Sequence, residues 1–145
     1  MNPKLIVVAG PNGAGKTTIT EKLLRHEWME DCVYINPDII AQEEFGGWNS
    51  PEAIIKAANH AQKMREDCLS NLQSMAFETV FSIPEKLLFI QRAQKAGFFV
   101  RFFFICTNDL VGPLARIIYF GTFHGTPLFI FARIRPFISS AVIDV

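Results

Sequence analysis

Four short apolar runs alternate with longer amphipathic segments along the first three quarters of the chain. The run from Leu5 to Ala9 is aliphatic and β-branched and stops at a glycine turn, which predicts a strand buried on both faces and central in its sheet. The other three runs predict further strands at Cys32 to Ile35, Met75 to Phe81 and Phe98 to Cys106.

The amphipathic segments between these runs predict three helices. Lys16 to His26 has apolar residues at helical spacing among polar ones. Ser50-Pro51-Glu52 supplies an N-cap, a first-turn proline and an acid, so a second helix is expected from there to about Leu72. A capping box at Ser82 to Glu85 begins a third helix, which is expected to end at Gly97. The core-facing stripe of the second helix is predicted to be Ile54, Ala58, Ala61, Cys68 and Leu72.

The alternation of strands and helices predicts an α/β fold with a mostly parallel sheet, helices on both faces and right-handed crossovers. Ligands of such sheets bind beyond the carboxyl ends of the strands. A chain of 145 residues, half of them apolar, suits a single domain.

The character of the chain changes at its C-terminal end. Residues 110–145 contain no lysine or glutamate, and no clear amphipathic helix can be recognised in them. The chain is therefore predicted to consist of a core at residues 1–109 and an atypical C-terminal segment at residues 110–145 of the same domain.

Charge and composition narrow the classes of partner. The 14 basic and 14 acidic residues give a formal net charge of zero, so no excess of charge favours nucleic acid or an anionic membrane as a partner. No apolar run is long enough to span a bilayer, and the N-terminus lacks the layout of a secretory signal. Three widely spaced cysteines are typical of a reduced protein, and a cytoplasmic location is expected.

The glycine turn after the first strand carries the clearest chemical signal. It reads Gly10, Pro11, Asn12, Gly13, Ala14, Gly15, Lys16 and Thr17, which fits the P-loop pattern G-x-x-x-x-G-K-[ST] between a predicted strand and a predicted helix. Glycines let backbone amides turn inward around an anion, and the positive end of the following helix reinforces the attraction. The motif predicts a three-layer P-loop NTPase or kinase fold that binds ATP or GTP.

The residues at the end of this loop have distinct expected roles. Lys16 is expected to reach the β- and γ-phosphates, and Thr17 to give a hydroxyl to Mg²⁺. Thr18 is expected at the α-phosphate.

Two carboxylates are candidates for the acceptor side of a phosphoryl transfer. Asp38 follows the second predicted strand, so it could face the γ-phosphate as a general base or simply form a turn after Pro37. Glu78 lies within the apolar third strand, where a charge is costly unless it meets a polar cleft or a partner. It is a candidate contact of substrate or metal-bound water, and a strand-end or paired surface glutamate is the alternative.

Three motifs taken together resemble the zeta toxin family. They are the P-loop with Thr18, the sequence Tyr34-Ile35-Asn36-Pro37-Asp38, and the sequence Ala76-Phe77-Glu78-Thr79, and the resemblance covers roughly residues 4–109. It implies a phosphotransferase that uses ATP or GTP to phosphorylate UDP-N-acetylglucosamine and that an antitoxin restrains. In that family role Asp38 is the base, Lys16 clamps the phosphates, and Glu78 and Thr79 lie at the acceptor.

The chain departs from the family after Asp109, because no arginine-rich helical lid can be aligned there. One hypothesis is a frameshifted or replaced lid, which leaves a nucleotide-binding remnant with impaired catalysis. The alternative is that residues 114–120 and 128–138 form divergent elements that complete the sheet, with Arg116 or Arg133 in place of the lid arginines. A P-loop kinase of another small metabolite is a further alternative, since the fold does not fix the acceptor.

Overall fold

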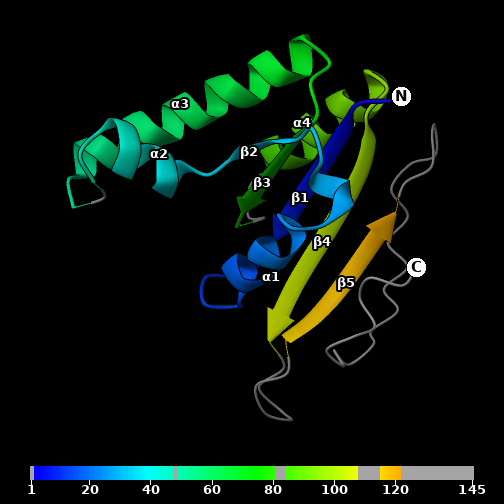
Figure 1. Cartoon of the computed structure of the whole chain (residues 1–145), viewed down its shortest axis with the longest axis horizontal. Coiled ribbons are helices and arrows are strands. Elements are labelled where there is room, and N and C mark those ends of the chain that lie inside the picture. The colour runs from blue at the N-terminus through cyan, green and yellow to red at the C-terminus, as the bar shows by residue number, and fades with distance from the viewer. Residues whose placement is uncertain (1, 48, 81–83, 108–114, 122–145) are drawn as a thin grey trace.

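A computed structural model describes residues 2–47, 49–80, 84–107 and 115–121. Its centre is a five-stranded sheet with the order β2-β3-β1-β4-β5 (Figure 1). The first four strands in this order are parallel and β5 is antiparallel to β4. The strands are β1 (Lys4–Ala9), β2 (Val33–Ile35), β3 (Met75–Thr79), β4 (Phe99–Thr107) and β5 (Ala115–Gly121).

The predicted α/β architecture is confirmed, with β1 at the centre of the sheet. Leu5 of β1 pairs with Met75 of β3 on one side and Val100 of β4 on the other. Leu5, Met75 and Val100 are fully buried. The carboxyl ends of four strands meet at one edge of the sheet, and α1 (Lys16–Leu23) begins at that edge (Figure 1).

The two faces of the sheet support two separate cores. One contains Ile6, Val8 and Ala76 of the sheet with Ile19 and Leu23 of α1. The other contains the alternate strand positions and the buried faces of the remaining helices, which are α2 (Pro37–Glu44), α3 (Pro51–Ser70) and α4 (Pro84–Lys95). The sheet is therefore a middle layer between α1 and the other three helices.

The helix α2 was not predicted from the sequence. There, Asn36-Pro37-Asp38 was expected only to end the preceding strand. These residues also begin a helix, because Asn36 is the N-cap, Pro37 is the first helical residue and Asp38 is the acid of the first turn. The Asn36 side-chain oxygen accepts a hydrogen bond of 2.9 Å from the backbone N–H of Asp38. Proline thus ends the strand and opens the helix within one turn.

The predicted inner stripe of α3 was wrong at three of its five positions. Ile54 and Leu72 are 51% and 55% exposed, and Ala58 is also exposed. The buried residues are instead Ala53, Ala57, Ala61, Cys68 and Leu69. Small alanines allow α3 to pack closely against α2, so the side chain of Ile54, one position after Ala53, is exposed; Leu72 lies beyond the end of the helix.

Element ends moved by a few residues elsewhere. The first helix ends at Leu23 and not at His26, which instead caps the short 3₁₀ helix η1 (Glu27–Met29). The predicted capping residue Ser82 lies outside the described residues, as does the segment 128–138. Residues 115–121 form β5, so the first half of the alternative for the C-terminal segment, an added strand, agrees with the structure.

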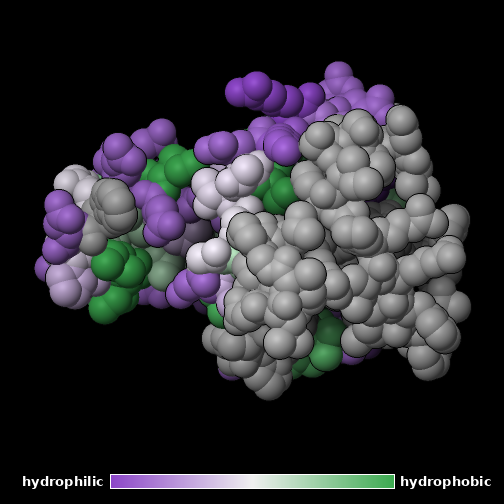
Figure 2. Space-filling view, turned by 90° about the horizontal axis from the view of Figure 1, so that it is seen from below, coloured by the Kyte–Doolittle hydropathy of each residue, from purple (hydrophilic) through white to green (hydrophobic). Residues whose placement is uncertain are grey.

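Apolar side chains are exposed where α2 and α3 lie, on the left of the view in Figure 2. The exposed large residues of these two helices are Ile39, Ile54 and Ile55, with exposed fractions of 42%, 51% and 61%. Within the described residues, the helices are all too short or too polar to cross a membrane.

Candidate functional site

The loop from Gly10 to Thr17 connects the end of β1 to the first turn of α1. Gly13 and Gly15 have φ angles of 77° and 89°, which L side chains rarely adopt. Left-handed residues within a tight turn aim successive N–H groups at one point, and this concave arrangement binds anions. Because α1 starts directly after Gly15, the positive end of its dipole adds to the attraction.

Two neighbouring strands hold the start of this loop. The N–H of Gly10 donates a hydrogen bond of 3.2 Å to the carbonyl oxygen of Thr79 at the end of β3. A Cβ atom at Gly10 would lie only 2.3 Å from the carbonyl oxygen of Ile105 in β4. The close approach of three strands therefore requires glycine at this position.

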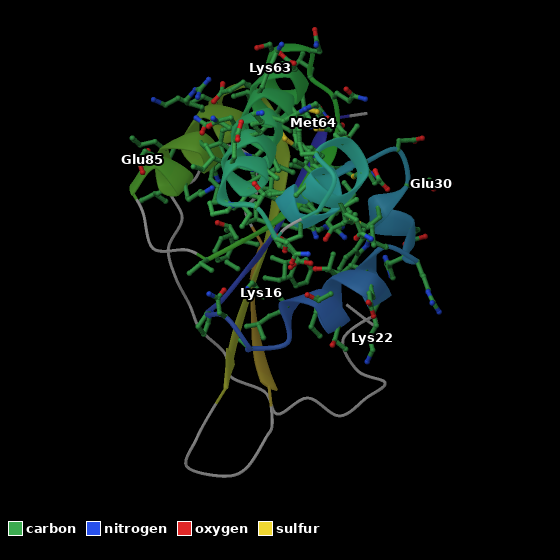
Figure 3. The ribbon with its side chains drawn as sticks, turned by 90° about the vertical axis from the view of Figure 1, so that its left-hand side faces the viewer. Lys16, Lys22, Glu30, Lys63, Met64 and Glu85 are labelled. Atoms are coloured by element: carbon green, nitrogen blue, oxygen red, sulfur yellow. The ribbon has the colours of Figure 1, made fainter. Side chains whose placement is uncertain are left out.

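Lys16 lies at the end of the loop, as expected from the motif. Its Nζ donates hydrogen bonds of 2.9 Å to the carbonyl oxygens of both Gly10 and Pro11. The ammonium group thus lies against the first two residues of the loop (Figure 3). An anion bound within the loop would lie beside Lys16.

Thr17 and Thr18 follow on the first turn of α1, and both are exposed. A single hydroxyl next to a phosphate site suits Mg²⁺, which keeps several waters and is held by few protein oxygens together with substrate phosphates. No group of three histidine, cysteine or acidic side chains that could hold a metal occurs within the described part of the chain. The donor set thus fits a metal held mainly by phosphates.

Asp38 lies beyond the carboxyl end of β2, in the first turn of α2. Its side chain is exposed, and its backbone N–H is held by the Asn36 side chain. The N-cap hydrogen bond fixes where the carboxylate leaves the backbone, at the edge of the sheet where the P-loop also lies.

Glu78 takes part in a short chain of hydrogen bonds between β2 and β3. The Tyr34 hydroxyl donates to Glu78 Oε1 at 2.9 Å, and the Asn36 side-chain amide donates to the Tyr34 oxygen at 3.0 Å. Burial is the main cause that raises the pKa of Tyr34 well above its usual value, and the nearby Glu78 carboxylate adds to the shift. The phenol therefore stays protonated and keeps donating to Glu78.

This chain of hydrogen bonds explains why a charged residue is tolerated within the apolar strand β3. Glu78 is partly buried, lies next to the end of β3 and meets a partner in Tyr34. The sequence reasoning did not identify Tyr34 as that partner. The available signal was the two-residue spacing of Tyr34 and Asn36, which puts both side chains on one face of a strand next to Glu78.

Thr79 is 8% exposed and lies at the end of β3. Its hydroxyl donates to the carbonyl oxygen of Val80 at 3.3 Å, and its own carbonyl accepts from Gly10. The structure therefore brings Thr79 to the P-loop through its backbone.

The fold and this loop together define the class of the protein. A mostly parallel sheet between helices, with a P-loop between its central strand and the first helix, is the architecture of P-loop kinases. Within that class the particular family is also shown. The sequence profile of the family described as Zeta toxin matches residues 1–113, and the chain belongs to this family.

Solved structures show the same fold. The chain is 23% identical to a structure of the PezAT chromosomal toxin–antitoxin system of Streptococcus pneumoniae, with a TM-score of 0.59 over 74% of this chain and 49% of that one. It is 21% identical to a candidate kinase from Chloroflexus aurantiacus, with a TM-score of 0.54 over 74% of this chain and 60% of that one.

A third match is a component of the Pnkp1/Rnl/Hen1 complex, at 21% identity and a TM-score of 0.51 over 70% of this chain and 35% of that one. The chain thus spans between about a third and three fifths of the length of these three proteins. No curated protein is significantly similar to it.

Proposed function

We propose that this protein transfers the γ-phosphoryl group of ATP or GTP to a hydroxyl of a small-molecule acceptor. The observation that carries the proposal is the P-loop, with its left-handed glycines and with Lys16 held against its first residues. Membership of the zeta toxin family supports the same activity. Candidate groups on the acceptor side lie at the same edge of the sheet.

The proposal gives each residue a role. The loop amides and Lys16 bind the phosphates and neutralise charge that develops on the transferred group. The hydroxyl of Thr17 would hold Mg²⁺, which would supply positive charge to the phosphates. Asp38 orients the acceptor hydroxyl and takes its proton. Glu78, held by Tyr34, binds the acceptor on the adjoining strand.

For the acceptor we propose a nucleotide sugar such as UDP-N-acetylglucosamine, and for a protein partner an antitoxin. The support for both is family membership, together with a structural neighbour that comes from a toxin–antitoxin system. A kinase acting on another small metabolite would use the same loop and the same base.

The direct test incubates the purified protein with γ-labelled ATP, Mg²⁺ and UDP-N-acetylglucosamine and looks for a labelled sugar nucleotide. Replacing Asp38 with Asn keeps the shape of the side chain and removes the base, so turnover is expected to fall by about a hundredfold or more while ATP binding is unchanged. Glu43→Gln is the matched control, because Glu43 is an exposed acid on the same helix. Equal loss in both variants would contradict a role for Asp38.

A second function, nucleotide binding with little catalysis, is favoured by one observation. Residues 110–145 carry only three arginines, and the match to the family ends at residue 113. The loss of an arginine at the transferring phosphate costs on the order of a thousandfold in rate. Calorimetry that detects tight ATP binding, with no labelled product from a panel of nucleotide sugars and simple metabolites, would select this function.

A further inference from the structure

The side chain of Asn36 makes hydrogen bonds with both ends of its amide group. Its Oδ1 accepts from the backbone N–H of Asp38 at 2.9 Å, and its Nδ2 donates to the Tyr34 hydroxyl oxygen at 3.0 Å. A backbone N–H can only donate, so the amide oxygen must face Asp38 and the amide nitrogen must face Tyr34. The N-cap of α2 therefore sets the direction in which Asn36 donates.

This direction also determines where the hydroxyl proton of Tyr34 points. Because the phenol oxygen already accepts from Asn36, its single proton is donated on the other side, to Glu78 Oε1 at 2.9 Å. Burial is the largest cause of the raised pKa of Tyr34, and the hydrogen bond from Asn36 opposes it. The carboxylates of Glu78 and Asp38 both add to the raised pKa, so both lie close enough to act on the phenol.

Three hydrogen bonds that run in one direction therefore connect the two candidate carboxylates of the acceptor side. They begin at the backbone N–H of Asp38 and end at one carboxylate oxygen of Glu78. Within the described residues, Glu78 Oε2 has no hydrogen-bond partner, so it remains available to a ligand. A carboxylate that is already held in one orientation loses less conformational entropy when it binds a ligand.

We propose that Asn36 and Tyr34 are positioning residues, which fix the carboxylate of Glu78 relative to the helix that carries the base. This inference rests on the proposed phosphoryl transfer, in which Asp38 takes the proton of the acceptor hydroxyl and Glu78 binds the acceptor. Asparagine suits the position because it offers an acceptor and a donor on one planar group. An aspartate would only accept, and would compete with Glu78 for the phenol proton.

Asn36→Asp tests the direction of the chain while it keeps an N-cap, since asparagine and aspartate cap helices about equally well. The KM for UDP-N-acetylglucosamine in the transfer assay is expected to rise by about tenfold, because Glu78 loses the phenol proton. The KM for ATP and the melting temperature should change little. Asn71→Asp is the matched control, because Asn71 is an exposed asparagine between α3 and the amino end of β3, at the opposite edge of the sheet. Its acceptor KM is expected to equal that of the unmodified protein.

Asn36→Ser and Tyr34→Phe separate loss of the chain from added charge. Serine also caps helices, but its side chain is one bond shorter and carries no charge. Each variant is expected to raise the acceptor KM by about tenfold. If the two residues act through one chain, the double variant should also show about a tenfold rise, whereas independent effects would multiply to about a hundredfold.

Amide hydrogen exchange at Asp38 tests the chain without the transfer reaction. In Tyr34→Phe the Asn36 amide nitrogen loses its partner, so the hydrogen bond that Asn36 accepts from the Asp38 N–H should open more often. The exchange rate at Asp38 is expected to rise by about threefold to tenfold. Phe lacks only the hydroxyl, so the packing of the ring is kept.

The inference is overturned if Tyr34→Phe and Asn36→Ser keep the acceptor KM of the unmodified protein, or if their effects on it multiply. An unchanged exchange rate at Asp38 in Tyr34→Phe overturns it as well. If the unmodified protein transfers phosphate to neither nucleotide sugars nor simple metabolites, the proposed function fails. Faster exchange at Asp38 in Tyr34→Phe would then still support the connection between the two carboxylates.

Discussion

Replacing Gly10 with alanine is expected to weaken ATP binding and lower stability, because the new side chain would push β1 and β4 apart. The added Cβ would lie 2.3 Å from the Ile105 carbonyl oxygen and 3.3 Å from its carbonyl carbon, whereas real Cβ atoms stay beyond 3.0 Å from such neighbours. The oxygen and the carbon belong to the backbone of β4, so no change of side-chain rotamer relieves the contact. The ends of β1 and β4 must therefore separate by about 0.7 Å.

The size of the effect follows from this displacement. Overpacking in a well-packed interior costs about 1–3 kcal/mol. For a chain of this length, that cost corresponds to a fall in melting temperature of roughly 3–10 °C. The same movement strains the 3.2 Å hydrogen bond from Gly10 to Thr79 and displaces the carbonyl to which Lys16 donates. ATP affinity is therefore expected to fall by at least about tenfold, because two contacts that shape the loop are weakened.

Thermal unfolding and ATP calorimetry measure the two parts of this prediction, with Gly46→Ala as the control. Gly46 has a φ of 77°, and an added Cβ there would meet nothing within 4 Å. Gly46→Ala should cost about 1 kcal/mol of backbone strain and leave ATP affinity unchanged. If Gly10→Ala matches Gly46→Ala in affinity and stability, the close approach of β1 and β4 does not constrain the loop.

Two other predictions concern individual side chains. Tyr34→Phe removes the donor to the partly buried Glu78 and should lower the free energy of unfolding by about 1–3 kcal/mol, measured by urea denaturation; an unchanged value would show that water replaces the phenol. Arg92 holds the pKa of Glu66 below its usual value, so the pair stabilises the fold above the unfolded-state pKa, and this contribution is lost as pH falls through the folded-state pKa. The unmodified protein should be slightly more stable than Glu66→Gln at pH 7, and this difference should shrink as the pH falls through the folded-state pKa of Glu66; a difference that does not change with pH would contradict the charge pairing.

Strand positions and the sheet class could be predicted from sequence because buried parallel strands read as continuous apolar runs, and Leu5 to Ala9 is such a run. The helix stripe of α3 could not be predicted as well. Its sequence offers both alanines and isoleucines at helical spacing, and hydrophobicity alone favours the larger residues. Close packing against α2 selects Ala53 and Ala57 and leaves Ile54 exposed.

The candidate site, too, could be predicted from the sequence only in part. The P-loop could be placed from sequence because its spacing, its preceding strand and its following helix are all local. The partner of Glu78 could not be placed, because it depends on the register in which β2 pairs with β3. Tyr34 is opposite Ala76 in that register, and only this pairing brings its hydroxyl to a carboxylate 44 residues away.

Adjacent residues of the motif in β3 have their side chains on opposite faces of the sheet. Side chains alternate along β3, so Glu78 shares a face with Ala76 and the α1 core, while Thr79 shares the opposite face with Phe77. Tyr34 can therefore hold Glu78 on the side of α1, where the P-loop helix begins. Phe77, on the other side, lines a cavity between α3 and α4. A ligand that reached both Glu78 and that cavity would have to pass over the carboxyl end of β3, next to the point where the Thr79 carbonyl holds Gly10.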